Sequence, residues 1–230
     1  MKNSILFIVF VSFSSILLGQ VYEAGISLGG TNYVGEIGRT NYIYPNKPAG
    51  AVFFKYNWNP RIALRATYSF LPIQGHNKNA DRVLPLFNGL DISYRNFSNT
   101  IHEFALGMEF NFYEYDLSSE DKTWTPYILL ELVGFNYSTI SAETSPEVYE
   151  FSNKTSTAIP FGMGFKSKLF GDLAFAIEAK FRYTFEYDLD YTTTRIPSLN
   201  FGTDSKDWYM FTGVSLIYTF GRPACYTQGL

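Results

Sequence analysis

The strongest constraint on this 230-residue chain is an alternation of apolar with polar or small residues that returns eight times. Side chains of a β-strand point alternately to opposite faces, so a period of two predicts strands. Helical spacing is nearly absent. The alternating segments are 22–29, 49–58, 62–71, 100–112, 125–137, 157–169, 173–187 and 207–220.

The two faces of these expected strands differ in an unusual way. The apolar face is rich in Phe and Tyr, whereas the opposite face carries glycine and charge. A soluble sandwich has shorter strands and buries its apolar face, but strands of about ten residues with one apolar face suit a bilayer. We therefore expect an all-β fold, an eight-stranded antiparallel transmembrane β-barrel of the outer-membrane type. A secreted, lipocalin-like soluble barrel is the alternative.

The connections between the expected strands alternate in length. Asn57-Trp58-Asn59-Pro60 and Gly171-Asp172 are short turn sequences, and the connection from Tyr113 to Trp124 is of moderate length. An even strand number with short turns on one rim and long loops on the other is typical of bacterial outer-membrane barrels. We expect the termini in the periplasm and the long loops outside. Those loops cover residues 30–48, 72–99, 138–156 and 188–206.

The first nineteen residues have the pattern of a secretory signal peptide. Lys2 precedes an apolar run from Ile5 to Leu18, and Gly19 supplies a small residue for cleavage. The run is shorter than the roughly 20 apolar residues that span a bilayer. We expect a signal peptide over 1–19, the barrel over 20–220 and a periplasmic tail over 221–230. The last strand ends on Phe220 and resembles the terminal strand that outer-membrane assembly machinery recognises.

The charged faces, if placed inside the barrel, form a neutral set of six acids and six bases. Ionised groups in a narrow interior must be paired or solvated, and an eight-stranded barrel holds only its own side chains. We expect these charges to plug the interior rather than to line a channel or to perform catalysis. The acids are Glu23, Glu103, Glu109, Glu131, Glu178 and Glu186, and the bases are Lys55, Arg65, Lys166, Lys168, Lys180 and Arg182.

Composition argues against several functional classes. The net charge of −3 and the absence of a basic run argue against nucleic-acid binding. Two histidines and one cysteine provide no zinc framework, so we expect no enzyme, metal site or cofactor. A small channel or receptor barrel is one alternative. A less favoured one is a rim-active hydrolase that would use His76, Asp81 and Asp91 of one external loop, whereas His102 starts a strand near the rim.

Two segments carry a resemblance to a known family. They read YEAGISLGGTNYVGEIG over 22–38 and AGAVFFKYNWNPRIALR over 49–65, and they resemble the PorG-type outer-membrane barrels of the Bacteroidota type IX secretion apparatus. Family members more often have Asp where Glu36 stands. The resemblance implies association with a periplasmic ring of a PorK-like lipoprotein and a PorN-like protein. It also implies roles in exporting proteins with C-terminal sorting domains and in gliding motility, with no catalytic residues.

With this resemblance, the expected function is an accessory structural subunit that anchors or stabilises the secretion ring at the outer membrane. We expect the partner to contact the periplasmic turns. Cys225 has no partner in the mature chain, so in an oxidising compartment any disulfide it forms is intermolecular; a free thiol is the alternative. The expected docking residues are Asn57, Trp58, Asn59, Pro60, Arg61, Tyr113, Trp124 and Cys225.

Overall fold

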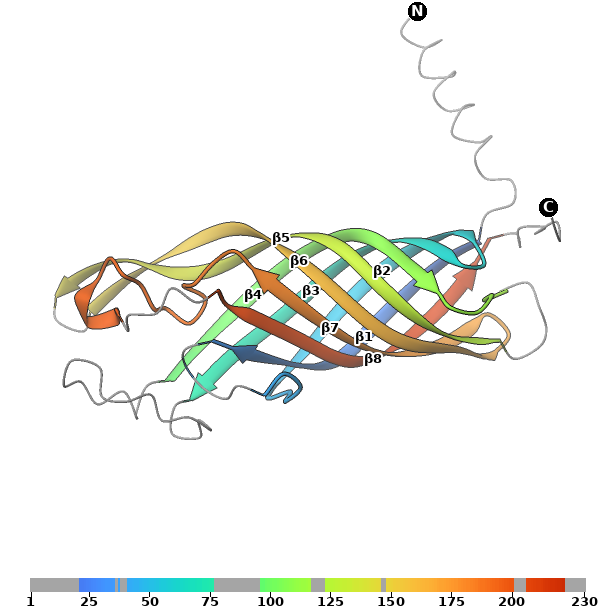
Figure 1. Cartoon of the computed structure of the whole chain (residues 1–230), viewed down its shortest axis with the longest axis horizontal. Coiled ribbons are helices and arrows are strands. Elements are labelled where there is room, and N and C mark those ends of the chain that lie inside the picture. The colour runs from blue at the N-terminus through green and yellow to red at the C-terminus, as the bar shows by residue number, and fades with distance from the viewer. Residues whose placement is uncertain are drawn as a thin grey trace, which may run out of the picture.

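Eight antiparallel strands form a closed barrel in chain order, with the last strand paired to the first (Figure 1). The computed structural model describes residues 21–35, 37, 41–76, 96–116, 123–145, 148–200 and 206–221, so the expected signal peptide lies outside the described residues. The expected eight-stranded fold is confirmed. The strands are β1 (Val21–Val34), β2 (Lys47–Asn59), β3 (Ile62–His76), β4 (Asn96–Asn111), β5 (Trp124–Ser145), β6 (Val148–Phe170), β7 (Leu173–Thr184) and β8 (Trp208–Phe220).

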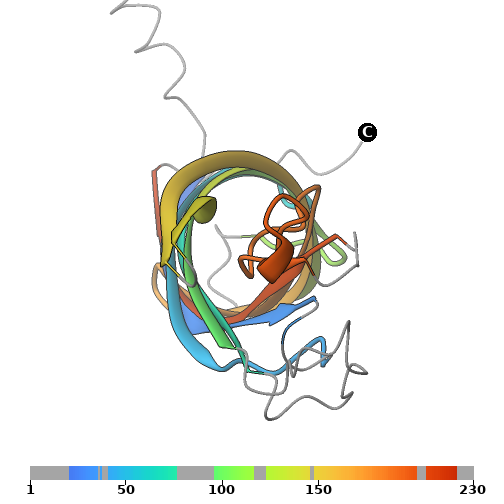
Figure 2. The same cartoon turned by 90° about the vertical axis from the view of Figure 1, so that its left-hand side faces the viewer.

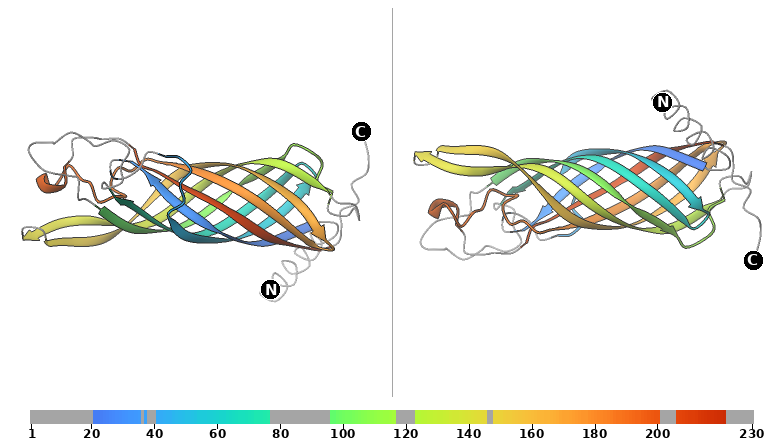
Figure 3. Two further views of the ribbon diagram at one scale, coloured as in Figure 1. Left: turned by 90° about the horizontal axis from the view of Figure 1, so that it is seen from below. Right: turned by 90° about the horizontal axis from the view of Figure 1, so that it is seen from above.

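The two ends of the barrel differ. At one end, which we call the turn end, lie the β2–β3 turn at Pro60–Arg61, the β6–β7 turn at Gly171–Asp172 and the paired residues Tyr22 and Phe220. At the opposite end, the loop end, β5 and β6 continue as a two-stranded ribbon beyond their neighbours (Figures 1 and 3). The segment after β7, with the short helix η3 (Pro197–Leu199), lies over part of the barrel mouth there (Figure 2).

The β5–β6 ribbon corrects the expectation of a long loop over 138–156. The two strands stay paired as far as Ser145 and Val148, through irregular registers at 140–142 and 143–145. Residues of the ribbon are exposed on both faces near its tip, and this exposure removes the alternation that marks a barrel strand. The strands β1, β3 and β4 also extend further toward the loop end than their alternation predicts, while β7 ends at Thr184 rather than at residue 187.

The barrel wall is apolar outside and charged inside. Leu132 and Ile26 are 73% and 59% exposed on the outer wall, whereas Lys55 and Glu103 are fully buried inside. Exposing so much apolar surface to water is unfavourable by about 25 cal/mol per Å², so this wall is suited to lipid. No helix among the described residues is long and apolar enough to cross a membrane.

The interior also contains apolar layers that the alternation only hinted at. Leu129, Val133 and Phe135 of β5 share the inward phase of Glu131 and are buried. Val133 and Phe135 pack with Leu71 and other side chains in a cluster toward the loop end. A smaller cluster around Phe53 lies nearer the turn end. The weak alternation of β5 therefore reflects an interior that is partly apolar, and these layers leave little room for water around the charges.

Close contact between β4 and β5 depends on Gly107. A Cβ atom at this position would lie 2.1 Å from the carbonyl oxygen of Leu130 and 2.5 Å from the Cα of Glu131. Since both atoms belong to the backbone, the two strands would have to separate. We predict that Gly107→Ala lowers the free energy of unfolding in micelles by about 1–3 kcal/mol, measured by urea titration.

The matched control is Gly134→Ala on β5, because a Cβ at Gly134 meets no atom within 4 Å. It should unfold within about 0.5 kcal/mol of the wild type. Equal stability of the two variants would contradict the close-contact explanation.

Candidate functional site

Ten of the twelve charges that the sequence places inside the barrel are buried there. They come from seven strands. Eight of them form a connected series of ion pairs, and Arg182 and Glu103 form a separate pair nearer the loop end. We call this set the interior charge network. Its members are Glu23, Lys55, Arg65, Glu103, Glu109, Glu131, Lys166, Glu178, Lys180 and Arg182.

The part of the network nearest the turn end centres on Glu109. Lys55 Nζ lies 2.8 Å from Glu109 Oε2 and 3.5 Å from Glu23 Oε2, and Lys166 pairs with the other oxygen of Glu109. The ring of Tyr115, in the β4–β5 connection, covers Lys166 with 4.4 Å between Nζ and the ring centroid. Burial, together with the negative charges of Glu23 and Glu109, raises the pKa of the Tyr115 hydroxyl. The phenol is therefore neutral, and its buried ring lies over the Lys166 ammonium group.

The middle of the network joins opposite walls of the barrel. Arg65 Nη1 lies 2.6 Å from Glu178 Oε2 and 3.6 Å from Glu109 Oε2, and Tyr127 donates a 2.7 Å hydrogen bond to Glu178. Lys180 Nζ lies 2.9 Å from Glu131 and 3.6 Å from Glu178. Each of these cations thus has one close carboxylate and a second one within ion-pair distance.

Toward the loop end the network finishes with a bidentate pair. Arg182 donates to both oxygens of Glu103 at 2.8 and 2.9 Å, and the Tyr209 hydroxyl donates to the same carboxylate at 2.9 Å. Two parallel charge-assisted bonds are the strongest arrangement open to such a pair. Beyond it lies the apolar cluster around Phe135.

Two predicted interior charges lie elsewhere, and this corrects the expectation. Lys168 is half-buried in the last residues of β6 at the turn end. Glu186 follows β7 at the loop end and pairs with Lys154 at 2.6 Å. Alternation alone does not show where the enclosed part of a strand stops. It also missed Lys154, which contacts Asp188 at 3.1 Å.

Sequence reasoning also missed three buried tyrosines that share the inward phase of their strands. Tyr127 and Tyr209 donate to network carboxylates. Tyr137 donates at 2.5 Å to Asp188, which lies outside the network. Their positions in the alternation, on the same side as the charged residues, could have identified these tyrosines as interior. The sequence interpretation instead grouped tyrosine with the lipid-facing aromatic residues. Among the described residues, no group of three or more His, Cys, Asp or Glu side chains is arranged to hold a metal ion.

The turn end carries most of the expected docking residues. Trp58 is 66% exposed and Arg61 is exposed, but Asn57 is buried and faces the interior because it lies in β2. Asn57 is therefore corrected from a surface residue to an interior one. The Asn59 side-chain oxygen accepts 2.8 Å hydrogen bonds from the backbone N–H groups of Arg61 and Ile62 and so shapes the turn.

The β2–β3 turn is bound to the β4–β5 connection. The Tyr115 N–H donates to the Pro60 carbonyl at 3.1 Å, and Arg61 contacts Glu114 at 3.3 Å. Beside them, the Tyr113 and Trp124 rings meet edge to face at 5.1 Å. The surface thus presents exposed aromatic rings and one arginine on a turn that is hydrogen-bonded to the neighbouring connection. We call Trp58, Arg61, Tyr113 and Trp124 the turn-end patch. Cys225 lies outside the described residues.

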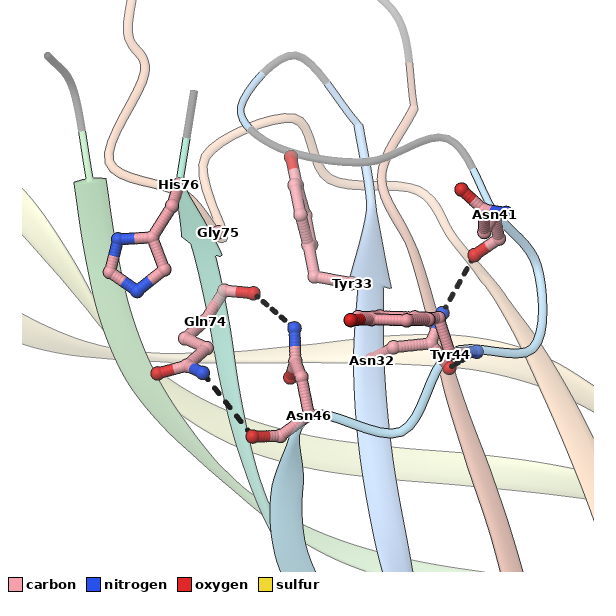
Figure 4. Close-up of a pocket in the computed structure, with 8 residues that line it drawn as sticks. All are labelled: Asn32, Tyr33, Asn41, Tyr44, Asn46, Gln74, Gly75 and His76. Carbon is pink, nitrogen blue, oxygen red and sulfur yellow. Dashed lines mark hydrogen bonds between the residues drawn. The ribbon is translucent and has the colours of Figure 1, made fainter. Parts of the chain in front are cut away.

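Two pockets at the loop end are lined by described residues that include no Lys, Arg, Asp or Glu. One lies between β3 and the segment before β2 and has a volume of about 170 Å³. In it Gln74 Nε2 donates to the Asn46 carbonyl at 3.2 Å, and Asn32 Nδ2 donates to the Asn41 carbonyl at 3.0 Å (Figure 4). His76 lines this pocket, whereas Asp81 and Asp91 lie outside the described residues. The second pocket lies where β4 and β5 separate, beyond the pair His102 and Asn136.

Comparisons with known proteins give one family and several structures of similar fold. A family model described as "Domain of unknown function (DUF6089)" matches residues 2–229. None of the curated proteins matches the chain. A major outer membrane protein from Thermus thermophilus is 11% identical, with 87% of this chain and 99% of that chain covered and a TM-score of 0.49.

Two further solved structures are similar at the same level. Neisserial surface protein A is 10% identical, with 88% and 97% of the two chains covered and a TM-score of 0.47. Ail, the attachment invasion locus protein of Yersinia pestis, solved with the heparin analogue sucrose octasulfate, is 11% identical, with 88% and 100% covered and a TM-score of 0.45. At TM-scores below 0.5, these likenesses carry no information on function.

The bidentate pair offers a direct test of the interior charge network. Glu103→Gln leaves the buried Arg182 charge without a counter-ion, so we predict a loss of about 3–5 kcal/mol in the free energy of unfolding. The double variant Glu103→Gln/Arg182→Met removes that lone charge and should recover part of the loss. Urea titration of the folded barrel in micelles measures both.

A matched control is the exposed pair at the turn end. Glu114→Gln breaks its ion pair with Arg61 in solvent and should cost less than about 1 kcal/mol. If Glu103→Gln proves as mild as Glu114→Gln, the network does not stabilise the barrel as described.

Proposed function

The chain belongs to the DUF6089 family, and we propose that it is a non-enzymatic outer-membrane subunit of a type IX secretion apparatus. In this function the barrel anchors or stabilises a periplasmic ring of PorK-like and PorN-like proteins. The apolar outer wall supports residence in the membrane. The resemblance of residues 22–38 and 49–65 to the PorG-type family supports the assignment to this apparatus.

The observation that carries the proposal is the filled interior. Paired charges occupy the middle of the barrel, Tyr115 covers them at the turn end, and an apolar cluster follows toward the loop end. In such a barrel, buried side chains occupy the described interior, and its ionised groups are paired with one another rather than poised as free acids or nucleophiles. A filled barrel suits a membrane anchor better than a conduit or an enzyme.

The turn end is the proposed ring-facing surface. The two segments that carry the family resemblance lie on adjacent elements, since Glu23 of β1 pairs in register with Lys55 of β2. The second segment continues through the β2–β3 turn into β3, so it includes Trp58, Pro60 and Arg61. In the proposed orientation this turn faces the periplasm, where exposed Trp and Arg are residue types that often dominate binding energy.

Affinity purification from native membranes in mild detergent tests the proposal. The ring proteins should be found with the wild-type chain by mass spectrometry. Trp58→Ala/Arg61→Glu should reduce their recovery by at least tenfold, because each hot-spot residue contributes about 2 kcal/mol or more. Phe151→Ala, which changes an aromatic side chain with 59% exposure on the loop-end ribbon, is the matched control and should leave recovery unchanged.

Equal recovery from the wild type and the turn-end variant would contradict this docking surface. Absence of the ring proteins from the wild-type sample would contradict the assignment to the apparatus. Heat-modified mobility on gels verifies that each variant has folded into a barrel.

The proposal extends to a covalent link at Cys225. In an oxidising periplasm, a thiol without an intramolecular partner forms a disulfide only with a second chain. We predict a larger species on non-reducing gels that disappears with reductant and is absent from Cys225→Ser. The same band in the Cys225→Ser sample would contradict the covalent link and leave the non-covalent contact standing.

A further inference from the structure

The outer wall of β3–β6 changes character toward the loop end. Its outward residues are apolar or aromatic as far as Phe70, Phe104, Leu132 and Ile159, all exposed. Beyond these, the outward positions as far as His76, Asn96, Ser138 and Asn153 are polar, apart from Pro72 and Gly134, and contain no Lys, Arg, Asp or Glu. Farther along the β5–β6 ribbon, Glu143, Glu150 and Phe151 are exposed. We call the following residues the polar band: Gln74, His76, Asn96, Ser98, Thr100, His102, Asn136, Ser138, Asn153, Thr155 and Thr157.

The band is continuous across four neighbouring strands. Gln74 pairs in register with Ser98, His102 with Asn136, and Asn136 with Thr155. Three inter-strand spacings of about 4.8 Å give the band a width of roughly 14 Å. It lies directly above the aromatic residues that mark the edge of the lipid-facing wall, where the Tyr68 hydroxyl and His102 Nδ1 are 2.9 Å apart. A molecule on this band would therefore contact the protein at the surface of the bilayer.

Hydrogen bonds hold the side-chain amides of Gln74 and Asn136 in place and leave their oxygen atoms as acceptors for a ligand. Gln74 Nε2 donates to the Asn46 carbonyl at 3.2 Å. Asn136 Nδ2 donates to the Lys154 carbonyl at 3.3 Å and to Thr155 Oγ1 at 3.1 Å. Among the described residues, none donates to the side-chain carbonyl oxygens of Gln74 and Asn136. The NH2 groups of these two amides are therefore already hydrogen-bonded, whereas their side-chain oxygens can still accept hydrogen bonds. A ligand with many O–H donors suits such oxygens.

Both loop-end pockets adjoin this band and share its chemistry. Gln74 and His76 line the first pocket, together with Tyr44 (Figure 4). Ser98, Thr100 and Asn136 line the second, where Asn99 bridges the separated strands by donating to the Ser138 and Leu189 carbonyls at 2.7 and 2.9 Å. Each pocket thus combines amides and hydroxyls with a tyrosine ring, which offers an apolar face beside a polar tip.

Among its described residues, the polar band carries no fixed positive charge, and this favours one class of ligand over another. Phosphate and sulfate groups are recognised by Arg and Lys, and the polar band has neither. Lys154, a described cation on β6 beside the band, is paired with Glu186 and Asp188. Uncharged hydroxyl groups need no counter-ion, and their hydrogen bonds to amides and hydroxyls satisfy both partners. This chemistry matches neutral sugar rings, whose apolar faces can also contact Tyr44 and Tyr191 at the pockets.

We infer that the polar band and its two pockets bind neutral sugar units at the outer surface of the membrane. The inference rests on the outer-membrane placement in the proposed function, with the loop end outward. The sugar can belong to a glycolipid headgroup or to a free oligosaccharide. Binding at this band is independent of the turn-end patch, which lies at the other end of the barrel.

The test uses the full-length barrel in a detergent without a sugar headgroup. Saturation-transfer NMR and calorimetry compare maltoheptaose with a sulfated form of the same oligosaccharide. We expect the neutral form to bind more tightly. Gln74→Ala/Asn136→Ala should weaken its binding by about tenfold, since it removes two groups that each form one hydrogen bond. Thr212→Ala, which removes a half-buried hydroxyl on the distant strand β8, is the matched control and should change nothing.

A second variant distinguishes the loss of a binding site from the loss of the folded barrel. Asn136→Lys places a cation in the band, so it should lose neutral binding and gain affinity for the sulfated oligosaccharide. In nanodiscs with equal amounts of a neutral diglycosyl lipid and phosphatidylglycerol, native mass spectrometry should find the glycolipid retained. If the glycolipid is retained but free maltoheptaose does not bind, the ligand is a sugar carried by a lipid. If the glycolipid and free maltoheptaose both bind, the sugar alone is sufficient for binding.

Three outcomes would overturn the inference. They are tighter binding of the sulfated form by the wild type, unchanged neutral binding in Gln74→Ala/Asn136→Ala, and absence of neutral-sugar binding in both the micelle and nanodisc experiments. Recovery of ring proteins by Gln74→Ala/Asn136→Ala separates this inference from the proposed function. Normal recovery without sugar binding refutes the sugar site alone, and normal sugar binding without ring proteins refutes the secretion assignment alone.

Discussion

The pairing of charges inside a space too narrow for bulk water is the interaction on which the rest of the structure depends. Most of these pairs join strands that are not neighbours in the barrel: Arg65 of β3 reaches Glu178 of β7, and Arg182 of β7 reaches Glu103 of β4. These two pairs therefore connect walls across the interior, in addition to the backbone ladder that connects adjacent strands. Because an unpaired buried charge is costly, this arrangement favours one barrel geometry over slipped registers.

Alternation along the chain was enough to predict the strand number, the closed barrel and the inward position of ten charges, because the period of two assigns each residue to a face. It could not predict where the enclosed interior begins and ends, so Lys168 and Glu186 were placed inside. The β5–β6 ribbon was missed because solvent on both faces removes the alternating pattern. The partners of Glu103 were also beyond reach, since contacts across the lumen depend on the stagger of the strands.

The two ends of the barrel offer different chemistry to different surroundings. The turn-end patch combines exposed aromatic rings with an arginine on a turn that is bound to its neighbouring connection, which favours contact with a protein surface. The polar band at the loop end has amides and hydroxyls without fixed charge. Between them the buried charges and apolar clusters of the interior separate the two surfaces, so the two proposed contact regions lie at opposite ends of the barrel.

The seam between β1 and β8 has a consequence for biogenesis. Those two strands pair in register from Tyr22↔Phe220 to Val34↔Trp208, so the cylinder cannot seal until nearly the whole polypeptide has been synthesised and exported. Until then, the apolar outward faces of the earlier strands belong to an open sheet rather than to a closed barrel. Contacts between the far ends of a chain also form slowly. The apolar outer faces of the earlier strands are therefore exposed for longer than in a fold with mostly local contacts.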